Sequence, residues 1–161
     1  MADVSSSANP LFLREDELQE GMELLFYAYR DFTAEPDAIL AKHNFGRAHH
    51  RVIYFVGRRP GMAVTELLGI LRITKQSLSR VLGELVRKGF VTQRQGTRDR
   101  RQRLLYLTDR GVELERRLTA NQRARIAKAY REAGAGAVAG YRKVLMGMIN
   151  EDDRRSLERS A

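Results

Sequence analysis

The sequence predicts a mainly α-helical fold that carries one small β-hairpin. Two observations support this prediction. Apolar residues recur every three or four positions over most of the 161-residue chain, which is typical of helices with one buried face. Between residues 90 and 107 the pattern changes to two short strands around a loop rich in arginine. A chain of this length is expected to form one cooperative unit with its own core.

The composition excludes several classes of protein. The chain has no cysteine, which excludes a disulfide scaffold, a cysteine zinc site, a thiol nucleophile and a cysteine redox sensor. No apolar run approaches the ~20 residues that a membrane span needs, and residues 1–10 lack the apolar region of a signal peptide. We therefore expect a cytoplasmic protein without membrane contact.

The net charge of +9 is unevenly distributed along the chain. Residues 1–40 carry a net charge of −7, whereas residues 41–86 and 87–110 carry +6 each and residues 111–161 carry +4. The densest stretch, residues 94–103, has five arginines that would repel one another in a compact fold. A phosphate backbone would relieve this repulsion, so the charge pattern favours a nucleic acid as partner.

The first third of the chain predicts helices separated by breaks. Residues 1–11 are expected to be disordered, and residues 15–32 to form a helix with a heptad-like apolar seam. Pro36 and Gly46 are expected to be breaks, with a short helical piece over residues 37–42 between them. The seam consists of Leu18, Met22, Leu25, Tyr29 and Phe32.

Three further helices are expected in the middle of the chain. Residues 47–56 form the first, the R-R-P-G sequence of residues 58–61 is a turn, and residues 64–71 form the second. Thr74 stands where the N-cap of the third helix belongs, and Gly89 ends that helix. Its apolar face consists of Leu78, Val81, Leu82, Leu85 and Val86.

The last third begins with the hairpin and returns to helix. Strands are expected at residues 90–94 and 103–107, joined by a long basic tip. Thr108 caps a helix over residues 109–132. A bend is expected in the glycine- and alanine-rich residues 133–140, from which a last helix emerges at Val138 and runs to Ser156.

Two short helices, a tight turn and a long-tipped hairpin follow one another in the order of a winged helix-turn-helix. In that arrangement the second helix presents its N-terminal polar face to base edges in the major groove, and its free backbone N–H groups suit a phosphate. The candidate DNA-binding residues of this helix are Thr74, Lys75, Gln76, Ser77, Ser79 and Arg80. Those of the hairpin are Arg98, Asp99, Arg100, Arg101 and Arg103.

Three motifs together resemble the MarR family of bacterial transcription regulators. They are the L-V-R-K-G-F sequence of residues 85–90, the D-R-R sequence of residues 99–101 and the L-T-D-R-G sequence of residues 107–111. The resemblance extends over residues 12–150. One position departs from the family pattern, because Ala63 stands where a hydroxyl residue usually caps the first helix of the motif.

The resemblance implies a division of labour along the chain. Residues 12–46 and 109–158 would be dimerisation helices, and residues 47–108 the DNA-binding lobe. It also implies that Arg101 enters the minor groove, where a narrow groove deepens the negative potential. Asp99 would then hold the wing by pairing with a nearby arginine.

The function expected from these features is that of a sequence-specific regulator which binds double-stranded DNA as a homodimer on a palindromic operator. A repressor is favoured over an activator, and no cofactor is expected. Many members of the family are released from DNA by a small aromatic or anionic ligand. The candidate ligand-binding residues are Phe26, Tyr27, Arg30, His49, His50, Arg51 and Tyr54, which combine cations with aromatic rings.

Alternatives remain at this level. Adjacent histidines at a helix–helix junction are more often structural than ligand-binding. A metal site at His43, His49 and His50 is weaker still, because no carboxylate has clear ligand spacing beside them. A winged-helix protein-interaction module without DNA binding is the main competing function. An enzyme is not expected, since neither a nucleophile nor a phosphate loop nor a paired-carboxylate pattern stands out.

Overall fold

The computed structural model describes residues 10–160. The chain divides into two compact units, the first ending at Thr119 and the second beginning at Ala120. The predicted disorder of residues 1–11 falls almost entirely outside the described residues, and Leu11 begins a short 3₁₀ helix, Leu11–Leu13. Among the described residues, none of the helices is long and apolar enough to cross a membrane.

Helix α1 (Glu15–Ala41) is continuous, so the predicted break at Pro36 is wrong. A proline inside a helix removes one backbone hydrogen bond and crowds the preceding turn, at a cost of about 3 kcal/mol. Packing offsets this cost, because Pro36 is fully buried and lies one turn before Leu40, which belongs to the hydrophobic core. Thr33 is also buried on this part of the helix, and its hydroxyl donates to the carbonyl oxygen of Tyr29 over 2.8 Å.

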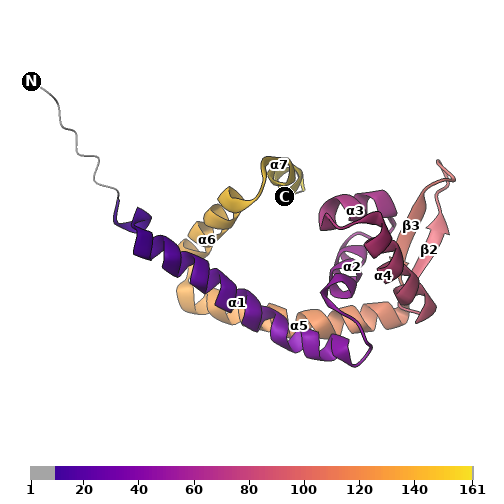
Figure 1. Ribbon diagram of the computed structural model, residues 1–161, viewed down its shortest axis with the longest axis horizontal. Helices are drawn as coiled ribbons and strands as arrows, with labels where there is room; N and C mark the ends of the chain where they lie inside the picture. The colour runs from indigo at the N-terminus through magenta and orange to yellow at the C-terminus, as the bar shows by residue number, and fades with distance from the viewer. Residues whose placement is uncertain (1–9, 161) are drawn as a thin grey trace, which may run out of the picture. The chain divides into compact units, whose positions relative to one another are not determined.

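Three helices, labelled in Figure 1, contribute many side chains to the core of the first unit. They are α2 (Arg47–Arg58), α3 (Val64–Leu71) and α4 (Lys75–Arg87). Their apolar faces follow the predicted spacing except at Val86, which is exposed because it lies at the edge of the buried face of α4. The pair α3 and α4 forms the expected helix-turn-helix. Fully buried core side chains from these helices are Val52, Ile53, Val56, Leu67, Leu78, Val81 and Leu85.

A three-stranded antiparallel sheet completes the lobe. Strands β2 (Val91–Gln95) and β3 (Arg103–Leu107) form the predicted hairpin, with Gln93 opposite Leu105. The third strand, β1 (Met62–Ala63), pairs with the other edge of β3 and was not predicted, because two residues are too short to show an alternating pattern. Ala63 therefore enters α3 from a strand, which fixes the start of that helix without a side-chain cap.

Helix α5 (Asp109–Ala133) begins at a tightly packed joint with the base of the hairpin. The hydroxyl of Thr108 donates to the carbonyl oxygen of Gly89 over 2.6 Å and accepts the N–H of Gly111 over 3.1 Å. The backbone N–H of Thr108 also donates to the carbonyl oxygen of Phe90. The L-T-D-R-G motif thus joins the end of α4, the start of β2 and the first turn of α5.

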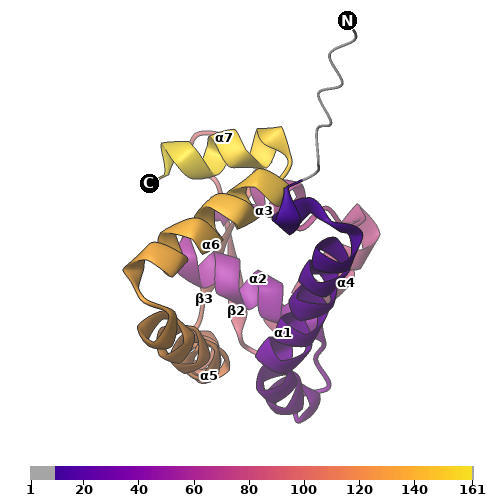
Figure 2. The same cartoon turned by 90° about the vertical axis from the view of Figure 1, so that its left-hand side faces the viewer.

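The second unit contains two helices after α5, α6 (Ala135–Met148) and α7 (Glu151–Arg159). The predicted bend shrinks to Gly134, whose φ of 86° favours glycine. The single last helix predicted up to Ser156 is wrong, since the chain leaves the helix at Ile149 and Asn150, and both views show the change of direction (Figures 1 and 2). The missed signal is Asn150 followed by three acids, a typical helix start.

Candidate nucleic-acid interface

The first turn of α4 has the predicted cap. Thr74 is the N-cap, and its Oγ1 accepts the backbone N–H of Ser77 over 3.1 Å. No acidic residue lies in this turn, so its backbone N–H groups and the positive end of the helix dipole remain available to an anion. The side chains of Lys75, Gln76, Ser79 and Arg80 are exposed, and Ser77 is half-buried.

The turn between α3 and α4 relies on an unusual backbone conformation. Arg72 has φ 52° and ψ 41°, the left-handed region that glycine prefers. Its N–H donates to the carbonyl oxygen of Leu68 over 3.0 Å and so ends α3. This conformation reverses the chain within three residues, which brings α4 to the angle at which its apolar face meets the core.

The tip of the wing, residues 96–102, is shaped by backbone groups. The N–H of Gly96 donates to the carbonyl oxygen of Gln102 over 2.9 Å, and the N–H of Gln102 donates to that of Asp99 over 3.1 Å. Gly96 is required there, since a Cβ would lie 2.5 Å from the carbonyl oxygen of Asp99. The side chain of Gln95 adds a bond to the carbonyl oxygen of Arg100.

The arginines of the wing are exposed, but Asp99 does not act as the resemblance implied. Its carboxylate accepts the backbone N–H of Arg101 over 3.0 Å, so among the described contacts it fixes the tip through the main chain and not through an arginine side chain. Arg103 leans toward Gln93 at the base of the tip. The exposed arginines around the tip are Arg98, Arg100, Arg101 and Arg103.

Glu84 is the acidic residue on the polar face of α4. Its Oε1 accepts from Arg80 over 3.0 Å, and its Oε2 lies 2.8 Å from Nε2 of His49. The hydrogen bond from His49, followed by the charge of His49 and the contact with Arg80, lowers the pKa of Glu84. Both carboxylate oxygens therefore have partners within the protein, at a surface that otherwise suits a polyanion.

The candidate ligand residues lie in separate groups. Phe26 and Tyr27 meet edge to face at 5.5 Å, and the guanidinium of Arg30 lies 4.8 Å from the Tyr27 ring. His49 belongs to another group with Phe45 and Glu84, while Tyr54 packs against Phe55 at 5.2 Å. These groups do not share a described contact.

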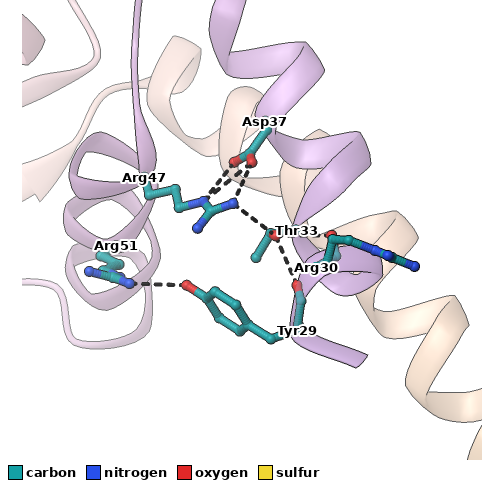
Figure 3. Close-up of polar contacts among 6 residues, drawn as sticks. All are labelled: Tyr29, Arg30, Thr33, Asp37, Arg47 and Arg51. Atoms are coloured by element: carbon teal, nitrogen blue, oxygen red, sulfur yellow. Dashed lines mark hydrogen bonds and ion pairs between the residues drawn. The ribbon is translucent and has the colours of Figure 1, made fainter. Parts of the chain in front are cut away.

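A polar cluster between α1 and α2 links part of this set to residues that the sequence analysis missed (Figure 3). Arg51 donates to the hydroxyl of Tyr29 over 3.1 Å. Arg47 donates to Asp37 over 3.0 Å and to Thr33 over 3.3 Å. Asp37 and Arg47 stand ten residues apart on two helices, and no periodic pattern signals such a pair.

The three histidines have structural surroundings. His43 stacks on Phe45 at 5.7 Å, and burial followed by nearby cations lowers its pKa. His50 is half-buried, and burial also lowers its pKa. His49 is the most buried of the three. Within residues 10–160, no group of three His, Cys, Asp or Glu side chains could hold a metal ion.

The sequence matches one family of proteins in its middle part and a curated relative over most of its length. Residues 43–102 match the model of the MarR family. The HTH-type transcriptional regulator PetP of Rhodobacter capsulatus is 52% identical over 145 residues, which cover 90% of this chain and 87% of that protein.

Two solved structures share the fold. Streptococcus pneumoniae FabT in complex with DNA has a TM-score of 0.71 at 21% identity, over 89% of this chain and 99% of that one. NadR in complex with 4-hydroxyphenylacetate has a TM-score of 0.66 at 20% identity, over 77% and 88%. The curated relative PetP is a transcriptional regulator. The chain belongs to the MarR family of transcriptional regulators.

Proposed function

We propose that this regulator binds double-stranded DNA sequence-specifically, as a homodimer on a palindromic operator, and acts as a repressor. One observation supports it above all. The first turn of α4 exposes hydrogen-bonding side chains and lacks an acid, and the same lobe carries a wing tip with exposed arginines. This pairing is what reading the major groove and contacting the adjacent minor groove requires.

Charge supports a phosphate partner. Residues 87–110 carry a net charge of +6, and the arginines at the wing tip are exposed. Each phosphate contact releases counterions, so binding must weaken steeply with salt. A DNA partner also implies that the protein works in the compartment that holds the chromosome.

Exposed apolar surface supports the homodimer. The 3₁₀ helix and α1 expose many large apolar side chains, more than a helix facing solvent needs. A second copy is the proposed occupant, and its two-fold symmetry would place half-sites about one helical turn, ~10 bp, apart. The exposed side chains are Leu11, Phe12, Leu13, Leu18, Met22, Leu24, Leu25, Phe26, Tyr27 and Tyr29.

Release by a small aromatic or anionic ligand is part of the proposal. NadR was solved with 4-hydroxyphenylacetate, an aromatic carboxylate. In this chain Arg30 and Tyr27 on α1, and Arg51 beside Tyr29, combine cations with aromatic rings and so suit that chemistry. Addition of such carboxylates to the protein–operator complex, followed by anisotropy, tests this part.

The test of DNA binding compares two variants on operator and random duplexes. The preferred site is first selected from a random duplex library with the full chain. Arg101→Ala is expected to weaken binding to all duplexes about equally, because an arginine in the minor groove is attracted mainly by the negative electrostatic potential of the groove. Gln76→Ala is expected to cost the selected site ~1–3 kcal/mol and random DNA almost nothing, since it removes a base contact.

Fluorescence anisotropy over a range of salt concentrations measures both effects. Arg142→Ala on α6 removes the same charge from an exposed position outside the lobe and serves as the control for Arg101. A salt slope near zero on every duplex contradicts the proposal. In that case, retention of another protein in place of DNA would support the interaction module.

A further inference from the structure

The two ring nitrogens of His49 have different partners, which determines where the proton lies. The backbone N–H of Gly46 donates to Nδ1 over 3.0 Å, so Nδ1 is the acceptor. In the neutral ring the proton then lies on Nε2, which donates to Oε2 of Glu84 over 2.8 Å. The ring also stacks on Phe45 with centroids 4.6 Å apart. Tautomer and orientation are therefore fixed by the fold.

This arrangement continues through Glu84 to the surface. Oε2 of Glu84 accepts from His49, and Oε1 accepts from Nη1 of Arg80 over 3.0 Å. The side chains become more exposed along this path, from 6% for His49 to 21% for Glu84 and 65% for Arg80. A buried ring on α2 is thus connected by two hydrogen bonds to an exposed guanidinium on α4.

An exposed Glu–Arg pair one turn apart on a helix usually holds no fixed geometry, because both side chains are free to rotate. Here one carboxylate oxygen is anchored to a buried group from a different helix. The other oxygen is therefore presented to Arg80 in one direction. The anchoring removes rotamers that Arg80 would otherwise lose on binding, which is how preorganisation improves recognition.

Arg80 lies one helical turn after Gln76 on the polar face of α4. Glu84 occupies one N–H of its guanidinium, and the group has five. The remaining donors suit the O6 and N7 acceptors of guanine, the geometry that arginine reads most often in the major groove. We propose that His49 is a positioning residue for sequence recognition, which holds Arg80 through Glu84 in the conformation that reads a guanine of the operator.

This inference rests on the proposed function and makes a narrower claim. If His49 served only the core, its loss would weaken binding to all sequences together. If it positions Arg80, its loss must relax the preference at one base pair of each half-site, the one that Arg80 reads. The two roles therefore differ in which base pairs are affected.

The experiment selects preferred sites from a random duplex library and then measures binding to all single-base variants of the best site. Arg80→Ala is expected to lose about tenfold preference for guanine at one position, as one arginine–guanine contact implies. His49→Leu is expected to lose about threefold at the same position and little elsewhere. His49→Gln is expected to keep the preference, because its amide can donate to Glu84 from nearly the same place.

A double variant tests whether His49 acts on base preference through Arg80. In the Arg80→Ala background, His49→Leu is expected to change no base preference further. If circular dichroism shows that His49→Leu does not fold, Glu84→Gln provides the same test, since an amide has a single accepting oxygen and its NH2 group cannot accept from the second partner. Glu113→Gln is the matched control, because it breaks an exposed glutamate–arginine pair with Arg116 on α5 that has no histidine behind it.

Two results would overturn the inference alone. One is a loss after His49→Leu that is equal at all base pairs, and the other is the same loss with and without Arg80. Enrichment of no sequence at all by the wild-type chain would overturn this inference and the proposed function together.

Discussion

Gly111 shows how one residue can position a site without touching DNA. A Cβ at this position would lie 2.1 Å from the carbonyl oxygen of Phe90, a distance that real side chains do not adopt. The first turn of α5 therefore packs backbone against backbone on the segment that leads from α4 into the wing. The L-T-D-R-G motif was recognised in the sequence by resemblance, and the contact supplies its physical reason.

We expect Gly111→Ala to destabilise the protein by about 1–3 kcal/mol, since a methyl group must displace main chain on one side. Urea unfolding followed by circular dichroism measures the change. Gly140→Ala in α6 is the control, because nothing lies within 4 Å of its added Cβ and alanine favours helix. Equal stability of Gly111→Ala and the wild-type chain would contradict the packing described.

Individual contacts across the fold were beyond the sequence. The residues of the α4 face followed from Thr74 and the apolar spacing behind it, and the structure exposes most of them. The bond between His49 and Glu84 joins residues 35 positions apart. Periodicity reports which face of a helix is buried and not which neighbour it meets, so this bond had no signal.

At the scale of elements, boundaries followed local chemistry where no other force opposed it. The β2–β3 hairpin and the start of α4 were predicted because turn and cap residues agree with the fold. The break predicted at Pro36 is wrong because burial of this side chain outweighs the local cost of a proline within a helix. The break between α6 and α7 was not predicted, because the apolar spacing continues up to Met148 and only Asn150 marks the start of a new helix.

The connection from α1 to α2 packs on the end of α4, and its chemistry predicts a pH effect. Burial, followed by Arg117 and Arg110, lowers the pKa of His43, and burial lowers that of His50. A histidine whose pKa is lower in the folded state favours folding fully above its unfolded pKa of about 6.5. That contribution is lost as the pH falls below this value.

We therefore expect the urea concentration at the unfolding midpoint to decrease when the pH is lowered from 7.5 to 5.5. His43→Gln is expected to flatten the dependence in part, because glutamine does not titrate. The lowered pKa of Glu84 acts at more acidic pH, below about 4.5, and leaves this window unaffected. A midpoint that stays constant or rises toward pH 5.5 would show that neither histidine is held neutral by the fold.

At the scale of the whole molecule, the distribution of charge and apolar surface was visible in the sequence. The acidic residues 1–40 include the exposed apolar positions of α1, and the basic residues 87–110 form the wing and its approach. The composition of a segment of tens of residues predicts whether its surface is charged or apolar. It does not report assembly, so the homodimer remains a prediction.

The double variant Met22→Glu and Leu25→Glu is expected to be a folded monomer that binds the selected palindrome much more weakly. Both side chains are exposed on the α1 seam, and charges there would be buried at the proposed interface. Sedimentation equilibrium measures the mass. Ala34→Glu, exposed on the opposite side of α1 from the seam, is the control that should leave the mass unchanged. A dimeric double variant would place the interface elsewhere.

The wing tip has a consequence for how such a regulator can diverge. Its shape comes from main-chain bonds, Gly96 and the side chains of Gln95 and Asp99. Arg98, Arg100 and Arg101 project from this frame. Mutations at the arginines can therefore accumulate at little cost to folding, while those at Gly96 or Asp99 cannot. In a duplicated gene, affinity for DNA could drift by small steps at the arginines long before the lobe itself changed.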